Sequence, residues 1–199
     1  MCYNILMKQA IVKFKIANRD QFEATLDRQN HDLSPIYWLH DRTYVPRGYR
    51  PRNNFPRLTM RTAMHAIDEP PTYTLLLRRH IEDSGLDIVE ETPVTDYVAT
   101  VNIITQLGFI QAGEVSRRRQ TAHLEDNVIL HLDELDGPTR ASSAATSVGD
   151  PAPAAPAIYA KLETTLQGTA SPLTAKTALI HLAKTLGEDN IIEKPYTEL

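Results

Sequence analysis

Cationic side chains recur at every second or every fourth position in three segments of this chain that have the composition of β-strands. They are Lys13 and Lys15, Arg57 and Arg61, and Arg117 and Arg119. Side chains two residues apart on a strand point to the same face of a sheet, so each pair shares one face. Several such strands in one sheet would gather positive charge on one surface, which becomes the interior if the sheet closes into a barrel. Such an interior suits a polyanion such as a chain of phosphates, because planar guanidinium groups match phosphate oxygens.

This basic character is local. The 199 residues carry 21 Lys and Arg against 25 Asp and Glu, a formal net charge of −4. A general nucleic-acid-binding protein is usually basic overall, so that class is not expected. The segment 42–67 nevertheless contains six arginines and no acidic residue. An acidic protein that gathers its arginines in this way is predicted to contain an anion site, although for any single arginine a solvated surface charge is the better interpretation.

Composition argues against several other classes of site. Cys2 is the only cysteine, so neither a disulfide framework nor a thiolate metal cluster is expected. The seven histidines show no metal-ligand spacing, which argues against a histidine zinc site. The chain shows no signal-peptide core and no stretch near the roughly 18 apolar residues that a membrane span needs. We therefore expect a cytoplasmic protein without a membrane partner.

Hydrophobic periodicity predicts eight strands and three helices. The strands are expected at 10–16, 36–45, 57–63, 73–79, 86–94, 109–120, 127–132 and 158–166, and the helices at 20–30, 95–107 and 171–186. Most connections suit hairpins, so we predict an α+β fold, an antiparallel eight-stranded β-barrel with flanking helices. Residues 137–156 are rich in Ala, Pro and Ser, which predicts a flexible loop within a single domain spanning residues 1–199.

Short motifs follow one another along nearly the whole chain. They are Gln9-Ala10-Ile11-Val12-Lys13, Asp41-Arg42-Thr43-Tyr44, Arg57-Leu58-Thr59-Met60-Arg61, Tyr73-Thr74-Leu75-Leu76-Leu77-Arg78, Leu107-Gly108-Phe109, Val115-Ser116-Arg117-Arg118-Arg119, Leu132-Asp133-Glu134-Leu135-Asp136-Gly137, Tyr159-Ala160-Lys161-Leu162-Glu163, and the ending Ile191-Ile192-Glu193-Lys194-Pro195-Tyr196-Thr197-Glu198-Leu199. In this order they resemble the CYTH family, also called triphosphate tunnel metalloenzymes. That family includes class IV adenylyl cyclases, thiamine triphosphatases and inorganic triphosphatases.

The resemblance implies a tunnel that binds a nucleotide triphosphate, thiamine triphosphate or inorganic polyphosphate. The phosphate-binding residues it implies are Lys13, Arg57, Arg61, Arg78, Arg117 and Arg119. It implies Mg or Mn as cofactor, with Glu163, Asp133 and Glu90 as the remaining candidate ligands. It also implies metal-dependent triphosphate hydrolysis or adenylyl cyclisation, and a homodimer as a possible assembly. It assigns no catalytic residue.

The chain departs from the family on the acidic side of the site. Gln9 and Ile11 stand where the family has two first-strand glutamates, and Lys161 replaces another near the end. Divalent ions such as magnesium want hard oxygen ligands, and Ile11 offers none. The basic residues that the resemblance implies are present, whereas several of the acidic residues are replaced.

Three functions therefore remain open. The first is a metal-dependent enzyme in which a magnesium ion at Glu163 orients the attacking oxygen. The second is a binding or regulatory protein that retains the polyphosphate without cleaving it, which the lost glutamates favour. The third is a protein–protein module with a vestigial tunnel. Under any of the three, the interior cations could form structural ion pairs across the barrel with Asp133 and Glu163, which a bound phosphate would exchange.

Overall fold

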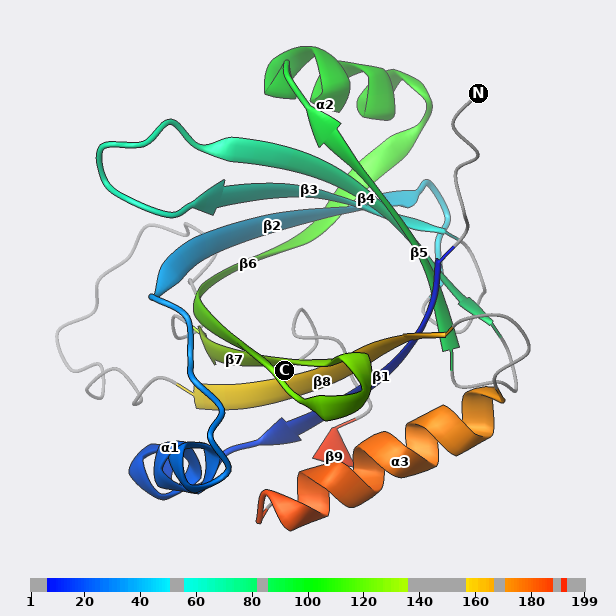
Figure 1. Ribbon diagram of the computed structural model, residues 1–199. Coiled ribbons are helices and arrows are strands. Elements are labelled where there is room, and N and C mark those ends of the chain that lie inside the picture. Colours follow the sequence, from blue (N-terminus) through cyan, green and yellow to red (C-terminus); the bar gives the residue numbers. More distant parts are fainter. Residues whose placement is uncertain are drawn as a thin grey trace, which may run out of the picture.

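A computed structural model shows the chain folded around one strongly curved antiparallel sheet with three helices on its outside (Figure 1). It describes residues 7–50, 56–81, 86–135, 157–166, 171–187 and 191–192. The elements in chain order are β1 (Met7–Lys15), α1 (Arg19–Arg28), β2 (Tyr37–Pro46), β3 (Arg57–Met64), β4 (Thr72–Ile81), β5 (Leu86–Val94), α2 (Tyr97–Gln106), β6 (Phe109–His123), a 3₁₀ turn (Glu125–Asn127), β7 (Val128–Leu135), β8 (Ala157–Leu166), α3 (Pro172–Thr185) and β9 (Ile191–Ile192). The predicted loop 137–156 and the end of the last motif, 193–199, lie outside the described residues.

The sheet curls until its two sides meet. Among the described residues its order is β5-β4-β3-β2-β6-β7-β8-β1-β9, and β5 also pairs with β1 over four residue pairs, 7–10 with 86–89. Further along the same edge of β1, β9 takes the neighbouring place. The predicted α+β fold with an antiparallel β-barrel and flanking helices is confirmed. The structure adds the short ninth strand and joins the ring at one end rather than along its full length.

Each helix begins at a side chain that satisfies a free backbone N–H group of its first turn. Asn18, Asp96 and Ser171 accept these hydrogen bonds at the starts of α1, α2 and α3. The first helix was expected to begin at residue 20, but Asn18 provides the cap and the helix begins at Arg19. After α2 the backbone turns at Gly108, whose φ of +88° favours glycine. This turn leads the chain directly into β6.

The larger apolar core lies outside the barrel, between the sheet and the helices α1 and α3. Successive outward residues of β1, among them Val12 and Phe14, are fully or almost fully buried in it. Phe22 of α1 meets Phe14 edge to face, with ring centroids 6.0 Å apart. Leu179 of α3 is also buried here. In Figure 1 both helices lie beneath β1, β7 and β8.

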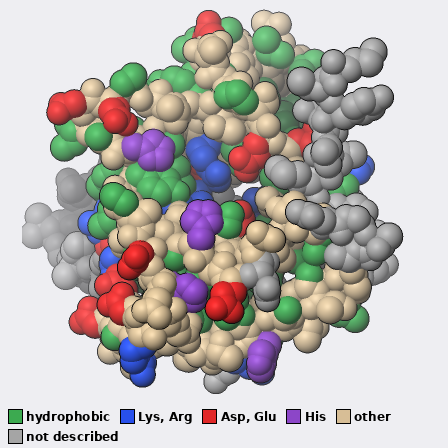
Figure 2. Space-filling view, in the orientation of Figure 1, with side chains coloured by type: hydrophobic (Ala, Val, Ile, Leu, Met, Phe, Trp, Pro, Cys, Tyr) green, Lys and Arg blue, Asp and Glu red, His purple; other side chains and the backbone are tan. Residues whose placement is uncertain are grey.

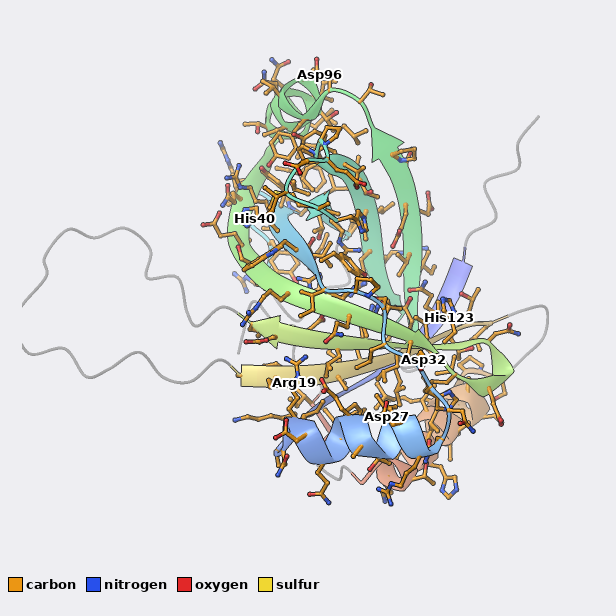
Figure 3. The ribbon with its side chains drawn as sticks, turned by 60° about the vertical axis from the view of Figure 1, so that its left-hand side comes forward. Arg19, Asp27, Asp32, His40, Asp96 and His123 are labelled. Atoms are coloured by element: carbon orange, nitrogen blue, oxygen red, sulfur yellow. The ribbon has the colours of Figure 1, made fainter. Side chains whose placement is uncertain are left out.

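A second, smaller cluster lies under α2 on the other side of the barrel. It contains Tyr44 of β2, Met60 of β3 and Ile104 of α2. Asp96, at the start of α2, and Asp27 of α1 mark opposite ends of the molecule in Figure 3. Because both apolar cores use outward-facing residues, the alternating inward positions of the strands are left for polar and charged side chains.

We expect Leu179→Ala to lower the free energy of unfolding by about 2–5 kcal/mol, because it opens a cavity between α3 and the sheet. Leu173→Ala is the matched control, since Leu173 lies on the same helix but is 74% exposed. Its effect should stay within about 0.5 kcal/mol. Denaturant unfolding of both variants measures the difference, and equal losses would contradict the packing described here.

Candidate functional site

The barrel encloses a cavity of about 110 Å³. Its lining residues are Lys13, Asp41, Thr43, Arg57, Thr59, Arg61, Leu76, Arg78, Val115, Arg117, Arg119 and Lys161. Seven of these twelve are Lys or Arg and one is acidic. Figure 2 shows a hollow near the middle of one face of the molecule with basic side chains at its wall. The interior is therefore a basic chamber with room for more than a single water molecule.

The structure brings all six predicted phosphate-binding residues to this one cavity. They come from four strands, with Lys13 on β1, Arg57 and Arg61 on β3, Arg78 on β4, and Arg117 and Arg119 on β6. Alternation along each strand accounts for this, since the intervening residues, such as Phe14 and Met60, belong to the outer cores. The placement is as expected from the sequence, and the binding of phosphate stays a proposal.

Three arginines and two aspartates form a continuous chain of ion pairs across four strands. Arg61 donates to both carboxylate oxygens of Asp41 at 2.8 and 3.0 Å, and Arg117 donates to Asp41 at 2.6 Å. Arg117 also lies 3.6 Å from Asp133, which accepts two hydrogen bonds from Arg119 at 2.5 and 2.6 Å. The two carboxylates thus fix the three guanidinium groups at the cavity wall.

Both aspartates remain ionised in this setting. Burial alone would raise the pKa of Asp41, but Arg117 and Arg61 together hold it far below its usual range. Burial likewise acts to raise the pKa of Asp133, and Arg119 and Arg117 hold it well below that range. Because paired, hydrogen-bonded carboxylates of this kind resist protonation, the chain of ion pairs persists over the physiological pH range.

A second polar cluster lies on β7 and β8. The ammonium of Lys161 donates to Glu163 at 2.5 Å, and Nε2 of His131 lies 3.3 Å from the same carboxylate. Burial lowers the pKa of Lys161 to about 7, with Glu163 opposing this change and Arg119 adding to it. Burial and Lys161 lower the pKa of His131 to about 3, so its ring is neutral at pH 7. Near pH 7 Lys161 is therefore close to half protonated, and a bound anion would favour its ammonium form.

Two pairs of like charges face each other across neighbouring strands inside the cavity. Lys13 of β1 lies directly opposite Lys161 of β8, and Arg57 of β3 lies directly opposite Arg78 of β4. All four residues line the cavity. Like charges directly opposite each other on a sheet are destabilising.

The three predicted metal ligands are not brought together. Glu90 pairs with Leu77, and Leu77 pairs with Leu58, which packs in the outer cluster under α2. Glu90 therefore points away from the cavity and is withdrawn as a candidate ligand. Asp133 and Glu163 are on the inner face, but both are bonded to cations. Across the part of the chain that the structure describes, no group of three or more His, Cys, Asp or Glu side chains is placed to hold a metal ion.

Three residues of the site were missed as members of it, namely Asp41, Lys161 and His131. Lys161 stands two positions from Glu163, and His131 two positions from Asp133, so strand alternation alone could have placed both on the inner face. Asp41 was noted within a motif, but its role as the partner of Arg61 and Arg117 depends on contacts across two strand pairs. That role is not visible in the local sequence.

The chain is similar over nearly its whole length to several solved structures. A "putative adenylate cyclase" from Vibrio parahaemolyticus is 13% identical with a TM-score of 0.72, covering 98% of each chain. A "putative adenylyl cyclase" from Hippeastrum, described as having a dominant triphosphatase activity, is 13% identical with a TM-score of 0.56, covering 96% of this chain and 93% of that one. A chain of the Mediator head module of Schizosaccharomyces pombe is 13% identical with a TM-score of 0.63, covering 94% of this chain and all of that one.

Because the sequence identities are low, these likenesses show the fold and nothing beyond it. No family model and no curated protein matches the sequence. Among the described helices, none combines the length and the apolar character needed to cross a membrane.

We expect Asp133→Asn to lower the free energy of unfolding by about 3–5 kcal/mol at pH 7, because it leaves the Arg119 charge buried without its partner. The pKa of Asp133 is depressed in the fold, so its contribution is present above about pH 5 and is lost as pH falls below about 4. The stability gap between wild type and variant should therefore narrow in acid.

Denaturant unfolding at pH 7 and at pH 3 measures this gap. Asp68→Asn, at an exposed turn, is the control and should leave stability almost unchanged. A gap that is small at pH 7, or that widens in acid, would show that Asp133 does not hold Arg119 as described.

Proposed function

Because this chain has the CYTH-domain fold and encloses a chamber walled by lysine and arginine, we propose that it binds a triphosphate-bearing anion inside the barrel. The class includes nucleoside triphosphates, thiamine triphosphate and inorganic polyphosphate. The observation that carries the proposal is the placement of two pairs of like charges directly opposite each other in the lining, Lys13 with Lys161 and Arg57 with Arg78. A phosphate chain between them replaces repulsion with charge-assisted hydrogen bonds.

A purely structural role accounts for only part of the cavity. Ion pairs explain Arg61, Arg117 and Arg119, each of which contacts an aspartate. On β3 and β4, Arg57 and Arg78 stand directly opposite each other and line the same space, an arrangement that a bound anion would stabilise. The likeness to proteins described as adenylyl cyclase and triphosphatase also supports a triphosphate ligand.

We favour a protein that binds the anion without cleaving it over one that hydrolyses it with the help of a metal ion. Metal-dependent hydrolysis usually needs carboxylates that hold divalent ions beside the phosphates. Here three carboxylates of the inner face, Asp41, Asp133 and Glu163, are engaged with cations of the protein itself. A binding or regulatory protein on this scaffold fits that arrangement better than a hydrolase or cyclase.

Arg57→Gln should weaken binding of tripolyphosphate at least tenfold at low salt, because it removes one cation from the chamber. It should leave the free energy of unfolding unchanged or raise it, because it also relieves the repulsion from Arg78. Arg79→Gln is the matched control, since Arg79 is the next residue on β4 and is exposed. Titration calorimetry and denaturant unfolding measure the two effects.

A structural role for Arg57 predicts the opposite pattern, in which Arg57→Gln loses stability while its affinity for tripolyphosphate stays at the wild-type value. Equal affinity losses in Arg57→Gln and Arg79→Gln would indicate general electrostatic attraction to the protein surface rather than a site in the barrel.

We expect no phosphate release at the rates of ordinary enzymes, about 1–1,000 s⁻¹, from tripolyphosphate, ATP or thiamine triphosphate with magnesium or manganese. The physical reason is the engagement of Glu163 with Lys161. If phosphate were released at such rates by the wild type and not by Glu163→Ala, the protein would be a metal-dependent triphosphatase. That result would contradict a protein that binds the anion without cleaving it.

A protein-interaction module is the second candidate function. The likeness to a chain of the Mediator head module favours it, as do the exposed apolar residues Val98, Ile103 and Leu107 on and beside α2. Calorimetry at low salt separates the two candidates, because an interaction module with a vestigial tunnel binds no tripolyphosphate.

A further inference from the structure

Glu163 stands alone among hydrocarbon neighbours in its row of the sheet. On one side it lies directly opposite Ile11 of β1, and on the other directly opposite Ile129 of β7. Neither side chain can ligate a metal ion. A hard divalent cation such as Mg²⁺ is held through oxygen ligands, usually one or two carboxylates together with phosphate oxygens. Within this row of β1, β8 and β7, Glu163 is the single carboxylate that could ligate an ion.

That single carboxylate is already bonded to a fixed cation. The Lys161 ammonium lies 2.5 Å from Glu163, and its side chain is only 9% exposed. Lys161 is among the residues that line the cavity, and Glu163, two positions further along β8, is not. A positive charge that could neutralise a bound phosphate is therefore present on the protein itself, next to the carboxylate.

Two further carboxylates of the inner face are held in the same way. Asp41 is bonded to Arg61 and Arg117, and Asp133 to Arg119. A divalent cation entering the chamber would have to displace at least one of these buried ion pairs. It would do so against the repulsion of seven lining cations. An anion meets the reverse situation, because each cation can turn part of its hydrogen bonding to phosphate oxygens.

We propose that the chamber binds its polyphosphate as the free anion, without a divalent metal ion, and that the Lys161 ammonium supplies the local charge that a metal would otherwise provide. This inference rests on the function proposed above. It narrows the ligand to a polyphosphate chain that is not complexed with magnesium.

The first test is calorimetric titration of the wild-type protein with tripolyphosphate, once in excess EDTA and once in excess Mg²⁺. Full binding is expected in EDTA. In Mg²⁺ the apparent affinity should stay equal or fall, because the metal competes with the protein for phosphate oxygens. Titration with Mn²⁺ alone should give no binding heat.

The second test uses variants at position 161. Lys161→Gln should weaken binding in EDTA at least tenfold, while Lys184→Gln, an exposed position near the end of α3, should change it less than twofold. Lys161→Glu places a second carboxylate beside Glu163. It should bind tripolyphosphate at least tenfold more tightly with Mn²⁺ than in EDTA, the reverse of wild type.

The outcomes separate this inference from the function on which it rests. Wild-type binding that requires Mg²⁺ or Mn²⁺ overturns the inference and leaves the proposed function standing. Wild-type affinity in Lys161→Gln overturns the role of Lys161. No binding of tripolyphosphate under any condition removes the proposed function and the inference together. Circular dichroism checks that the variants fold, and the wild-type comparison stands without them.

Discussion

Enclosing seven cationic side chains in one chamber is the constraint on which the rest of this structure depends. Charge removed from water is costly unless it is paired, so such an interior needs counter-charges built into the same walls. Asp41 and Asp133 provide them for three arginines, with Arg117 contacting both carboxylates. Glu163 does the same for Lys161. The carboxylates hold the guanidinium and ammonium groups in place around the cavity.

The charged interior also explains why the apolar cores lie outside the barrel. A strand presents alternate residues to opposite faces, so inward Lys and Arg leave the outward positions as the only place for the core. Those positions need cover, which α1 and α3 give to one side and α2 to the other. The three helices are thus required by what the strands carry inside, and each begins at a polar cap that the sequence places in advance of it.

Local alternation predicted much of this arrangement, and long-range pairing set its limits. Lys13 and Arg57 could be assigned to one face because each is followed by an apolar residue of the opposite face, whereas Arg119 was assigned by its alternation with Arg117. Glu90 could not, since β5 has Ile88 and Val89 adjacent and its facing depends on the register with Leu77 of β4. The role of Asp133 as an ion-pair partner could not be predicted either, because Arg119 lies 14 positions away in the sequence, on another strand. The motifs indicated the fold. Whether each inner carboxylate is bonded to a cation could be seen only from the contacts between strands.

The lining also bears on what the chamber recognises. Apart from the charged groups, it contains Thr43, Thr59, Leu76 and Val115, with no aromatic side chain among the lining residues that the structure describes. Aromatic faces are what proteins commonly use to stack a base. A chamber built of guanidinium, ammonium and hydroxyl groups instead reads oxygens along a phosphate chain. Under the proposed function, selection among triphosphate-bearing ligands inside the barrel would rest on the length and charge of the phosphate chain, and a base or thiamine ring would have to be recognised outside this lining.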